Sequence, residues 1–251
     1  MRSALSEHLE KEQFPQFPAP VAVHPGGGGH APHHPYLQHH FDNMAQQAEA
    51  STLGMWVFLV TEIMFFGGLF MAYLVYRWQS PMGFQEASHH LNIYWGTANT
   101  ALLIISSLTM AFAVRAAQTS MPAKTQAGWL VATMILGAGF LGIKAIEYTE
   151  KFTHHLVPGP NFEWPGFAAN AKAAEQFYSL YFAMTGLHAL HMVIGLGIMT
   201  VISIMAWRKT FDREYYTPVE VAGLYWHFVD IVWIFLFPLL YLIGRHYHAG
   251  K

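Results

Sequence analysis

The sequence of 251 residues contains no cysteine. This absence excludes disulfide scaffolds, zinc ribbons, iron–sulfur clusters, thiolate-ligated copper centres and covalently attached c-type haem, because each of them needs cysteine side chains. The sixteen histidines keep one class of site open, which is the binding of a metal ion or a haem through imidazole alone.

Charged residues are also scarce. They make up 11% of the chain, against about 25% in typical soluble domains. With 13 Lys and Arg against 15 Asp and Glu, the formal net charge is −2, which leaves no basic surface for a nucleic-acid partner. Apolar residues reach 53% and aromatic residues 16%, and most charges fall in a few gaps between long apolar stretches. This distribution is typical of an integral membrane protein.

Residues 1–50 differ in composition from the rest of the chain. They hold seven of the histidines, six of them in HPGGGGHAPHHPYLQHH, which runs from His24 to His40. Gly and Pro at this density cannot bury a core, so the segment is expected to be disordered. The histidines are a candidate metal-binding cluster, but the run lacks a carboxylate, a cysteine and a fixed ligand spacing, which favours the disordered interpretation. The sequence thus divides into a tail, 1–50, and a membrane domain, 51–251.

Five stretches of the membrane domain are apolar enough to cross a bilayer. Each holds about twenty residues or more, and at a rise of about 1.5 Å per residue this length covers a hydrocarbon core of about 30 Å. Only helices satisfy their own backbone groups at that length. The sequence therefore predicts an all-α integral membrane protein, a bundle of five transmembrane helices with a disordered N-terminal tail. The predicted spans are 53–76, 93–114, 127–148, 177–207 and 219–243.

Lys and Arg are distributed unequally between the two sides that these spans create. One side carries seven of them, whereas the other carries five, with Lys144 near the end of the third span. Since Lys and Arg concentrate in cytoplasmic loops, the N-terminus is expected in the cytoplasm and the C-terminus outside. The seven residues are Arg2, Lys11, Arg115, Lys124, Arg208, Lys209 and Arg213.

Ionisable residues inside the predicted spans are the most informative side chains. Glu62 lies about a third of the way into the first span, in LVTEIMFFGGLF. A carboxyl group there costs about 3 kcal/mol on insertion scales, so it faces the bundle or water and by default marks a function. A protonated glutamic acid that hydrogen-bonds a neighbouring helix explains it equally well, and the sequence leaves both interpretations open.

Two later spans each carry a pair of ionisable residues at positions i and i+3, so the two members of each pair share a helix face. As metal ligands, His188 and His191 would need further ligands from other helices, so interhelical hydrogen bonds are favoured for them. A buried aspartate is seldom left alone in lipid, and we therefore expect Asp230 to pair with His227, as a proton relay or as a structural clamp.

Charged residues at the end of the third span and a proline inside the fifth span are also informative. Lys144 and Glu147 lie one turn apart and are followed by Glu150 and Lys151, which near an interface favours a snorkelling ion-pair cluster. Pro238 is expected to bend the fifth helix, because it frees a carbonyl one turn earlier. Small residues are expected to let the helices approach closely, at Gly67, Gly68, Gly137, Gly139, Gly142, Gly195 and Gly197.

These motifs together resemble subunit III of the haem–copper terminal oxidases, the cytochrome c oxidase family. The matching stretches follow the family's order from about residue 51 to residue 245. Many members have seven helices, and this chain resembles the five-helix bacterial form. The stretches are LVTEIMFFGGLFMAY, NTALLIISSLTMAFA, KAIEYTE, GLHALHMVIGLGIM and YWHFVDIVWIFLFPLLYL.

The resemblance implies a role in aerobic respiratory electron transport, within a complex that pumps protons and is an oxidoreductase and translocase. The chain itself would be non-catalytic and hold no metal or other cofactor, with haem and copper in partner subunits. It would pack directly against subunit I, work with subunit II, bind phospholipids, and support proton uptake and durability. It would lie in the bacterial cytoplasmic (inner) membrane.

The resemblance also assigns residues. Glu62 matches the family's intramembrane carboxylate, which serves proton uptake or structure, and no residue is catalytic. The recurrent polar positions of the family fall on Glu147, His188, His191, His227 and Asp230.

Other interpretations remain open at the level of sequence. Subunit III of a quinol oxidase shares the same plan, and the electron donor is not readable because it binds partner subunits. A subunit of a nitric oxide reductase system is less favoured, since such chains are usually shorter. A stand-alone haem-binding or metal-binding membrane protein would instead use the histidine pairs as ligands.

Overall fold

The computed structural model describes residues 35–244 of the chain. Most of the predicted tail therefore lies outside the described residues, including five of its seven histidines and with them most of the candidate metal-binding cluster. The remaining two, His39 and His40, lie in turns that precede the first described helix.

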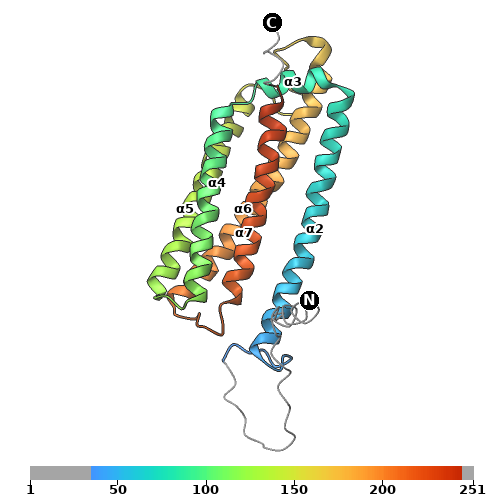
Figure 1. Ribbon diagram of the computed structural model, residues 1–251. Helices are drawn as coiled ribbons and strands as arrows, with labels where there is room; N and C mark the ends of the chain where they lie inside the picture. Colours follow the sequence, from blue (N-terminus) through green and yellow to red (C-terminus); the bar gives the residue numbers. More distant parts are fainter. Residues whose placement is uncertain (1–34, 245–251) are drawn as a thin grey trace, which may run out of the picture. The chain divides into compact units, whose positions relative to one another are not determined.

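Five long helices dominate the structure, and all five are long and apolar enough to cross a membrane. The described part of the chain contains no strand, so the predicted all-α bundle of five spans is confirmed. A short helix that the sequence analysis did not predict, α3 (Pro81–His89), connects the first two long helices (Figure 1). The long helices are α2 (Met44–Gln79), α4 (Ile93–Gln118), α5 (Ala123–Thr153), α6 (Ala171–Trp207) and α7 (Thr217–Phe237).

Side chains at the helix starts explain where the helices begin. Asn43 precedes α2, and its side-chain oxygen accepts a hydrogen bond of 2.9 Å from the backbone N–H of Gln46. Asn92 does the same for α4, accepting from the N–H of Tyr94 at 3.0 Å. Asparagine is a preferred residue at this position because the first N–H groups of a helix have no partner within it. Helix α2 consequently begins well before the apolar run that predicted the first span.

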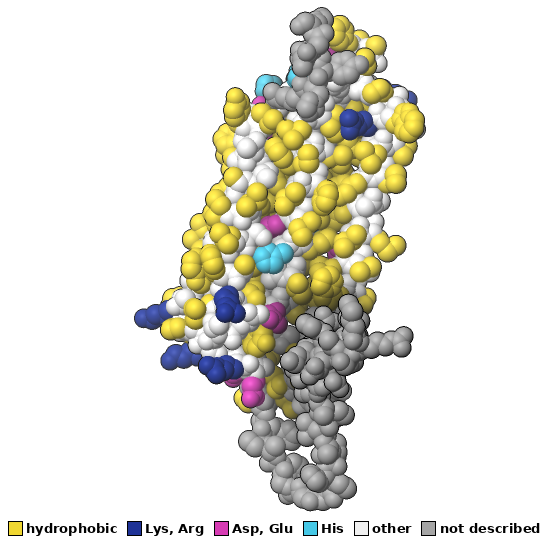
Figure 2. Space-filling model, in the orientation of Figure 1, with side chains coloured by type: hydrophobic (Ala, Val, Ile, Leu, Met, Phe, Trp, Pro, Cys, Tyr) yellow, Lys and Arg dark blue, Asp and Glu magenta, His cyan; other side chains and the backbone are white. Residues whose placement is uncertain are grey.

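Four of the helices close into a ring of packed pairs. Helix α4 packs on α5, α5 on α6, α6 on α7, and α7 again on α4, while α2 lies against α6 and α7 (Figure 1). Helix α7 is the most enclosed span and α2 the least. Apolar side chains cover the visible sides of the helices, and Lys and Arg gather mainly toward the end where α4 meets α5 (Figure 2). This arrangement is the one expected of helices that face lipid.

The packing around α7 depends on two glycines. A Cβ atom added at Gly137 or Gly195 would lie 2.7 Å or 2.9 Å from ring atoms of Trp226, which is fully buried. The indole N–H of Trp226 donates to Ser106 Oγ on α4 at 3.0 Å. The wider expectation for the other glycines is wrong at four positions, because a Cβ would meet nothing within 4 Å at Gly67, Gly68, Gly142 and Gly197.

At Pro238, where the sequence predicts a bend, α7 is followed by a π-helical turn, η2 (Pro238–Leu242). The carbonyl groups of this last turn have no partner within the helix. Tyr73 of α2 donates its hydroxyl to the Leu239 oxygen, and Ser88 of α3 donates to the Leu240 oxygen, both at 2.8 Å. The short helix α3 is therefore held against the end of α7.

Candidate functional site

Glu62 of α2 and His191 of α6 meet between their helices. The distance from His191 Nε2 to Glu62 Oε2 is 3.1 Å, and the side chains are only 13% and 18% exposed for His191 and Glu62, respectively. The other imidazole nitrogen, Nδ1, lies 2.8 Å from the Leu187 carbonyl oxygen. A carbonyl only accepts, so Nδ1 carries a proton, and the bond between Nε2 and the carboxyl group then contains one more proton. The two groups share that proton, either as imidazolium and carboxylate or as imidazole and carboxylic acid.

Neighbouring side chains hold the His191 ring and its backbone in place. The ring of Phe66 packs edge-on against the imidazole with 5.3 Å between the centroids. The hydroxyl of Tyr225 on α7 donates to the His191 carbonyl oxygen at 2.9 Å. Three helices thus fix the position of one pair of ionisable groups inside the membrane domain.

Lys144 and Glu147 lie deep inside the bundle, so the predicted snorkelling cluster is wrong for these two residues. Lys144 is 3% exposed and Glu147 is 0% exposed. Lys144 Nζ lies 3.0 Å from Glu147 Oε2 and donates to the Tyr241 hydroxyl at 2.8 Å. Tyr241 in turn donates to Glu147 Oε1 at 2.5 Å. The π-helical turn of η2 brings Tyr241 over the pair, and the sequence pattern of one helix could not reveal that contact.

Aromatic rings complete the surroundings of the Lys144 ammonium group. Its Nζ lies 4.9 Å from the ring centroid of Trp233 and 5.1 Å from that of Tyr181, within the range of a cation–π interaction. Tyr181 also accepts a hydrogen bond from Nζ at 3.3 Å. Every proton of the ammonium group therefore has an acceptor, which is what a buried charge requires.

The remainder of the predicted cluster lies at the helix end. Lys151 is buried there and donates to the carbonyl oxygen of His90 at 2.7 Å. His90 follows α3 and lies outside the membrane-spanning helices. Burial and the nearby positive charge of Lys151 lower the pKa of the His90 imidazole.

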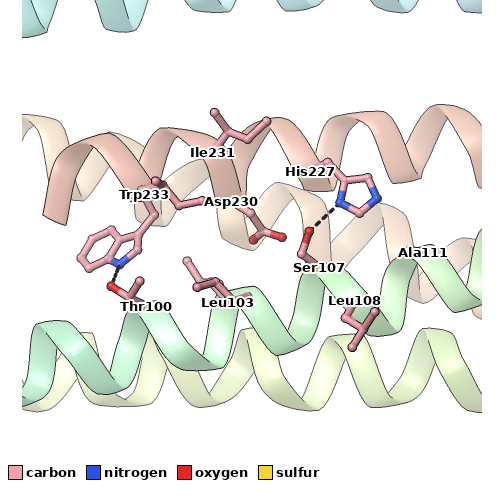
Figure 3. A pocket seen from close by; sticks show the side chains of 11 residues that line it. Thr100, Leu103, Ser107, Leu108, Ala111, His227, Asp230, Ile231 and Trp233 are labelled. Carbon is pink, nitrogen blue, oxygen red and sulfur yellow. Dashed lines mark hydrogen bonds between the residues drawn. The ribbon is translucent and has the colours of Figure 1, made fainter. Parts of the chain in front are cut away.

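His227 and Asp230 share a face of α7, but the predicted pair between them does not form. His227 Nδ1 bonds instead to the hydroxyl of Ser107 on α4, at 2.7 Å (Figure 3). The Asp230 carboxyl group points toward α4, beside the same serine. It is 4% exposed, and the Ser107 hydroxyl is the group of the described chain in reach of a hydrogen bond to it. The serine lies 120 positions away in sequence, so the i, i+3 spacing could not anticipate it.

His188 behaves differently from His191, although the two share a helix. It is fully buried, with its ring centroid 5.3 Å from those of Phe140 and Trp233. Neither ring nitrogen has a hydrogen-bond partner among the described residues. The predicted interhelical hydrogen bond is thus present for His191 and absent for His188. Successive i, i+3 positions differ by about 60° around a helix, which is enough to give them different neighbours.

The hydroxyl groups that hydrogen-bond these ionisable side chains were not predicted from the sequence. Ser107, Tyr181 and Tyr241 carry no signal of their own, because serine and tyrosine are common in membrane helices. Asn99 could have been found, since an amide inside an apolar run stands out; it is fully buried on α4 and has no partner within the described residues. Within residues 35–244, no group of three His, Asp or Glu side chains is arranged to hold a metal ion.

The fold and these groups define the class of protein as a multi-pass α-helical membrane protein with ionisable groups bonded between its helices. Comparison with known proteins identifies the family. The family described as cytochrome c oxidase subunit III matches residues 163–245. That segment contains His188, His191, His227 and Asp230.

Bacterial relatives match over most of the chain. Cytochrome bo(3) ubiquinol oxidase subunit 3 of Pseudomonas aeruginosa is 31% identical, over 82% of this chain and 91% of that protein. Cytochrome c oxidase subunit 3 of Thermostichus vulcanus is 31% identical, over 81% and 92%. Quinol oxidase subunit 3 of Bacillus subtilis is 30% identical, over 83% and 97%. The chain therefore belongs to the subunit III family of the haem–copper oxidases, and it is part of a multi-subunit respiratory oxidoreductase complex.

Proposed function

We propose that this chain is the accessory subunit of its oxidase complex and supports the supply of protons to the catalytic subunit. It packs directly against subunit I in the bacterial cytoplasmic membrane, with subunit II in the same complex. Its N-terminus lies in the cytoplasm and its C-terminus outside, as the excess of Lys and Arg on the first side favours.

Electron transfer is assigned to the partner subunits, which hold the haem and copper centres and bind the electron donor. Two observations support this division. The chain has no cysteine. Its three histidines inside the spans are each engaged or enclosed, since His191 bonds Glu62, His227 bonds Ser107, and aromatic rings surround His188.

The proton that Glu62 and His191 share carries the proposal. A carboxyl group bonded to an imidazole exchanges a proton readily, because either partner can hold it. The pair is partly exposed, so water that reaches this depth of the membrane has access to the shared proton. The Leu187 carbonyl and the Tyr225 hydroxyl keep the imidazole in position while the proton moves.

The test replaces Glu62 with glutamine in the assembled oxidase. Glu62→Gln keeps the size and most of the hydrogen bonding but cannot ionise. We expect an unchanged haem spectrum and a modest fall in the initial rate of oxygen consumption. A stronger loss is expected at alkaline pH or after prolonged turnover, when protons are scarce or damage accumulates.

Glu62→Asp is the matched control, since it retains an ionisable carboxyl group on a shorter side chain. Activity that recovers in Glu62→Asp at alkaline pH supports a proton role. If Glu62→Gln abolishes oxygen reduction and alters the haem spectrum, the chain lies closer to the chemistry than proposed. If it changes nothing under any condition, the pair is only a structural hydrogen bond.

Phospholipid binding is the second part of the proposal. An apolar hollow of about 470 Å³ lies between α2 and α7. Trp56, Leu59, Phe66, Phe228 and Phe235 are among the residues that line it. Its volume and apolar lining suit an acyl chain, and the loose packing of α2 against the bundle leaves room for one. Mass spectrometry of the intact complex tests this, since Leu59→Trp should fill the hollow and reduce the lipid retained.

A further inference from the structure

The ring formed by α4, α5, α6 and α7 encloses a polar layer that the proposed function does not use. Trp226 of α7 gives a reference level, because its ring lies against Gly137 of α5 and Gly195 of α6 and its indole N–H bonds Ser106 of α4. Seven residues make about two helical turns, so positions i and i+7 share a helix face. Two turns closer to α3, the same four faces carry Asn99, Lys144, His188 and Trp233.

Contacts within this layer support the arrangement. The ring centroid of Trp233 lies 5.3 Å from that of His188 and 4.9 Å from Lys144 Nζ. The indole N–H of Trp233 donates to Thr100 Oγ1, next to Asn99 on α4, at 3.1 Å (Figure 3). All four members of the layer are 3% exposed or less. The layer is thus enclosed by the protein itself.

Two members of the layer have unused hydrogen-bonding groups. Among the described residues, the amide nitrogen and oxygen of Asn99 have no hydrogen-bond partner, and neither have the two ring nitrogens of His188. Lys144 and Trp233, in contrast, donate to Glu147, Tyr181, Tyr241 and Thr100. An unpartnered polar group is costly inside a protein, so four such atoms at one level indicate a bound partner.

The chemistry of these atoms restricts the ligand. Asn99 offers both donors and acceptors. A second positive charge beside the Lys144 ammonium group would be costly, so the His188 imidazole is neutral and offers one donor and one acceptor. The ligand must therefore both donate and accept. A bare cation or anion cannot do both, whereas water can, and water is small enough for an enclosed layer.

We infer that a small cluster of water molecules binds in this layer and bridges Asn99 of α4 to His188 of α6. The two nitrogens of an imidazole ring point away from each other, so a single water molecule cannot bond both, and the cluster holds more than one. Buried water typically bonds polar groups that would otherwise be unsatisfied. The cluster joins α4 and α6, which lie opposite each other in the ring, and it is independent of the proton role proposed for Glu62.

Electron cryo-microscopy of the wild-type complex, at a resolution that shows ordered water, tests the inference directly. We expect water peaks within hydrogen-bonding distance of the Asn99 amide and of both His188 nitrogens. A layer without peaks, in a map that shows ordered water elsewhere in the membrane domain, overturns the inference. A density too large for water overturns it as well, and so does a direct hydrogen bond between Asn99 and His188.

Two variants test which side chains hold the water. Asn99→Leu and His188→Leu each remove one set of bonding groups, so the peaks beside the replaced side chain should disappear. Met184→Leu is the matched control, because Met184 is fully buried, apolar and one turn from His188 on α6. It should keep every peak, and loss of the peaks in this control would show that they depend on packing and not on the two polar side chains.

The double variant tests the bridge. If the two residues share the cluster, either single substitution already leaves the other residue without its partner. The unfolding midpoint of the double variant should therefore fall by less than the sum of the two single falls. Additive shifts would mean that no shared cluster exists. Circular dichroism shows whether each variant keeps its helix content, and the wild-type map depends on no substitution.

Discussion

Among single residues, Lys144 places a positive charge where the membrane domain is fully enclosed. Glu147 neutralises the charge, and Tyr181 and Tyr241 supply the remaining hydrogen-bond acceptors. A buried ion pair recovers its desolvation cost only when each partner is fully bonded. The stability of this part of the bundle should therefore be sensitive to loss of one partner and less sensitive to loss of both.

Lys144→Met tests this dependence. The substitution removes the positive charge and leaves Glu147 buried without its counter-ion, so we expect the free energy of unfolding to fall by about 3 to 5 kcal/mol. Thermal unfolding of the purified complex, followed by circular dichroism, measures the change.

The double variant Lys144→Met with Glu147→Leu is the matched control. It removes both charges and should recover a large part of the lost stability, although the hydroxyls of Tyr181 and Tyr241 then lose their bonds to Lys144 and Glu147. A double variant less stable than Lys144→Met would contradict the view that the unpaired carboxylate causes the loss.

At the scale of helices, the Trp226 ring of α7 sets how closely α5 and α6 can each approach α7. Its ring lies against Gly137 of α5 and Gly195 of α6, at distances that leave no room for a Cβ atom. Gly197, only two residues further along α6, has open space at the same atom. The two glycines of α6 thus provide a paired comparison within one helix.

Gly195→Ala should force Trp226 or a helix to move, at a cost of about 1 to 3 kcal/mol. Gly197→Ala should be neutral or stabilise the helix slightly, by up to about 1 kcal/mol, because alanine is a better helix former than glycine. The unfolding midpoints of both variants, measured under the same detergent conditions, compare the two stability changes. Equal effects at the two positions would mean that the contact with Trp226 does not limit the packing.

At the scale of the whole molecule, the number of spans sets the relation between the two ends of the chain. Five helices of the described chain are long and apolar enough to cross a membrane, and an odd number of crossings is expected to place the two termini on opposite sides. Together with the Lys and Arg excess, this predicts that a fusion at residue 30 lies in the cytoplasm and a fusion at the C-terminus outside.

Reporter enzymes that are active on only one side of the membrane, fused at these two places, measure the topology. Protease protection of the same fusions provides an independent reading. Both ends on one side would mean that one of the five helices does not cross. If the N-terminus lies outside and the C-terminus in the cytoplasm, the number of spans is still correct, but the rule that Lys and Arg concentrate in cytoplasmic loops fails for this chain.

The fold was predictable because each span is a local property of the sequence. A run of about twenty apolar residues has only one way to satisfy its backbone in lipid, whatever the rest of the chain does. Helix α3 was not predictable in the same way, since it is short and is held by contacts with α6 and with the last turn of α7. The family was predictable too, because its motifs lie within single helices.

The partners of the polar residues, in contrast, were decided by tertiary structure. The residues themselves stood out in the sequence, because an ionisable side chain in a span costs several kcal/mol and is seldom there without a reason. Asp230 and His227 share a face of α7, yet Ser107 of α4 binds the imidazole. Glu62 bonds His191 on a helix 129 positions away. The spacing along one helix determines which side chains share a face, but the rotation and crossing of neighbouring helices determine what that face meets.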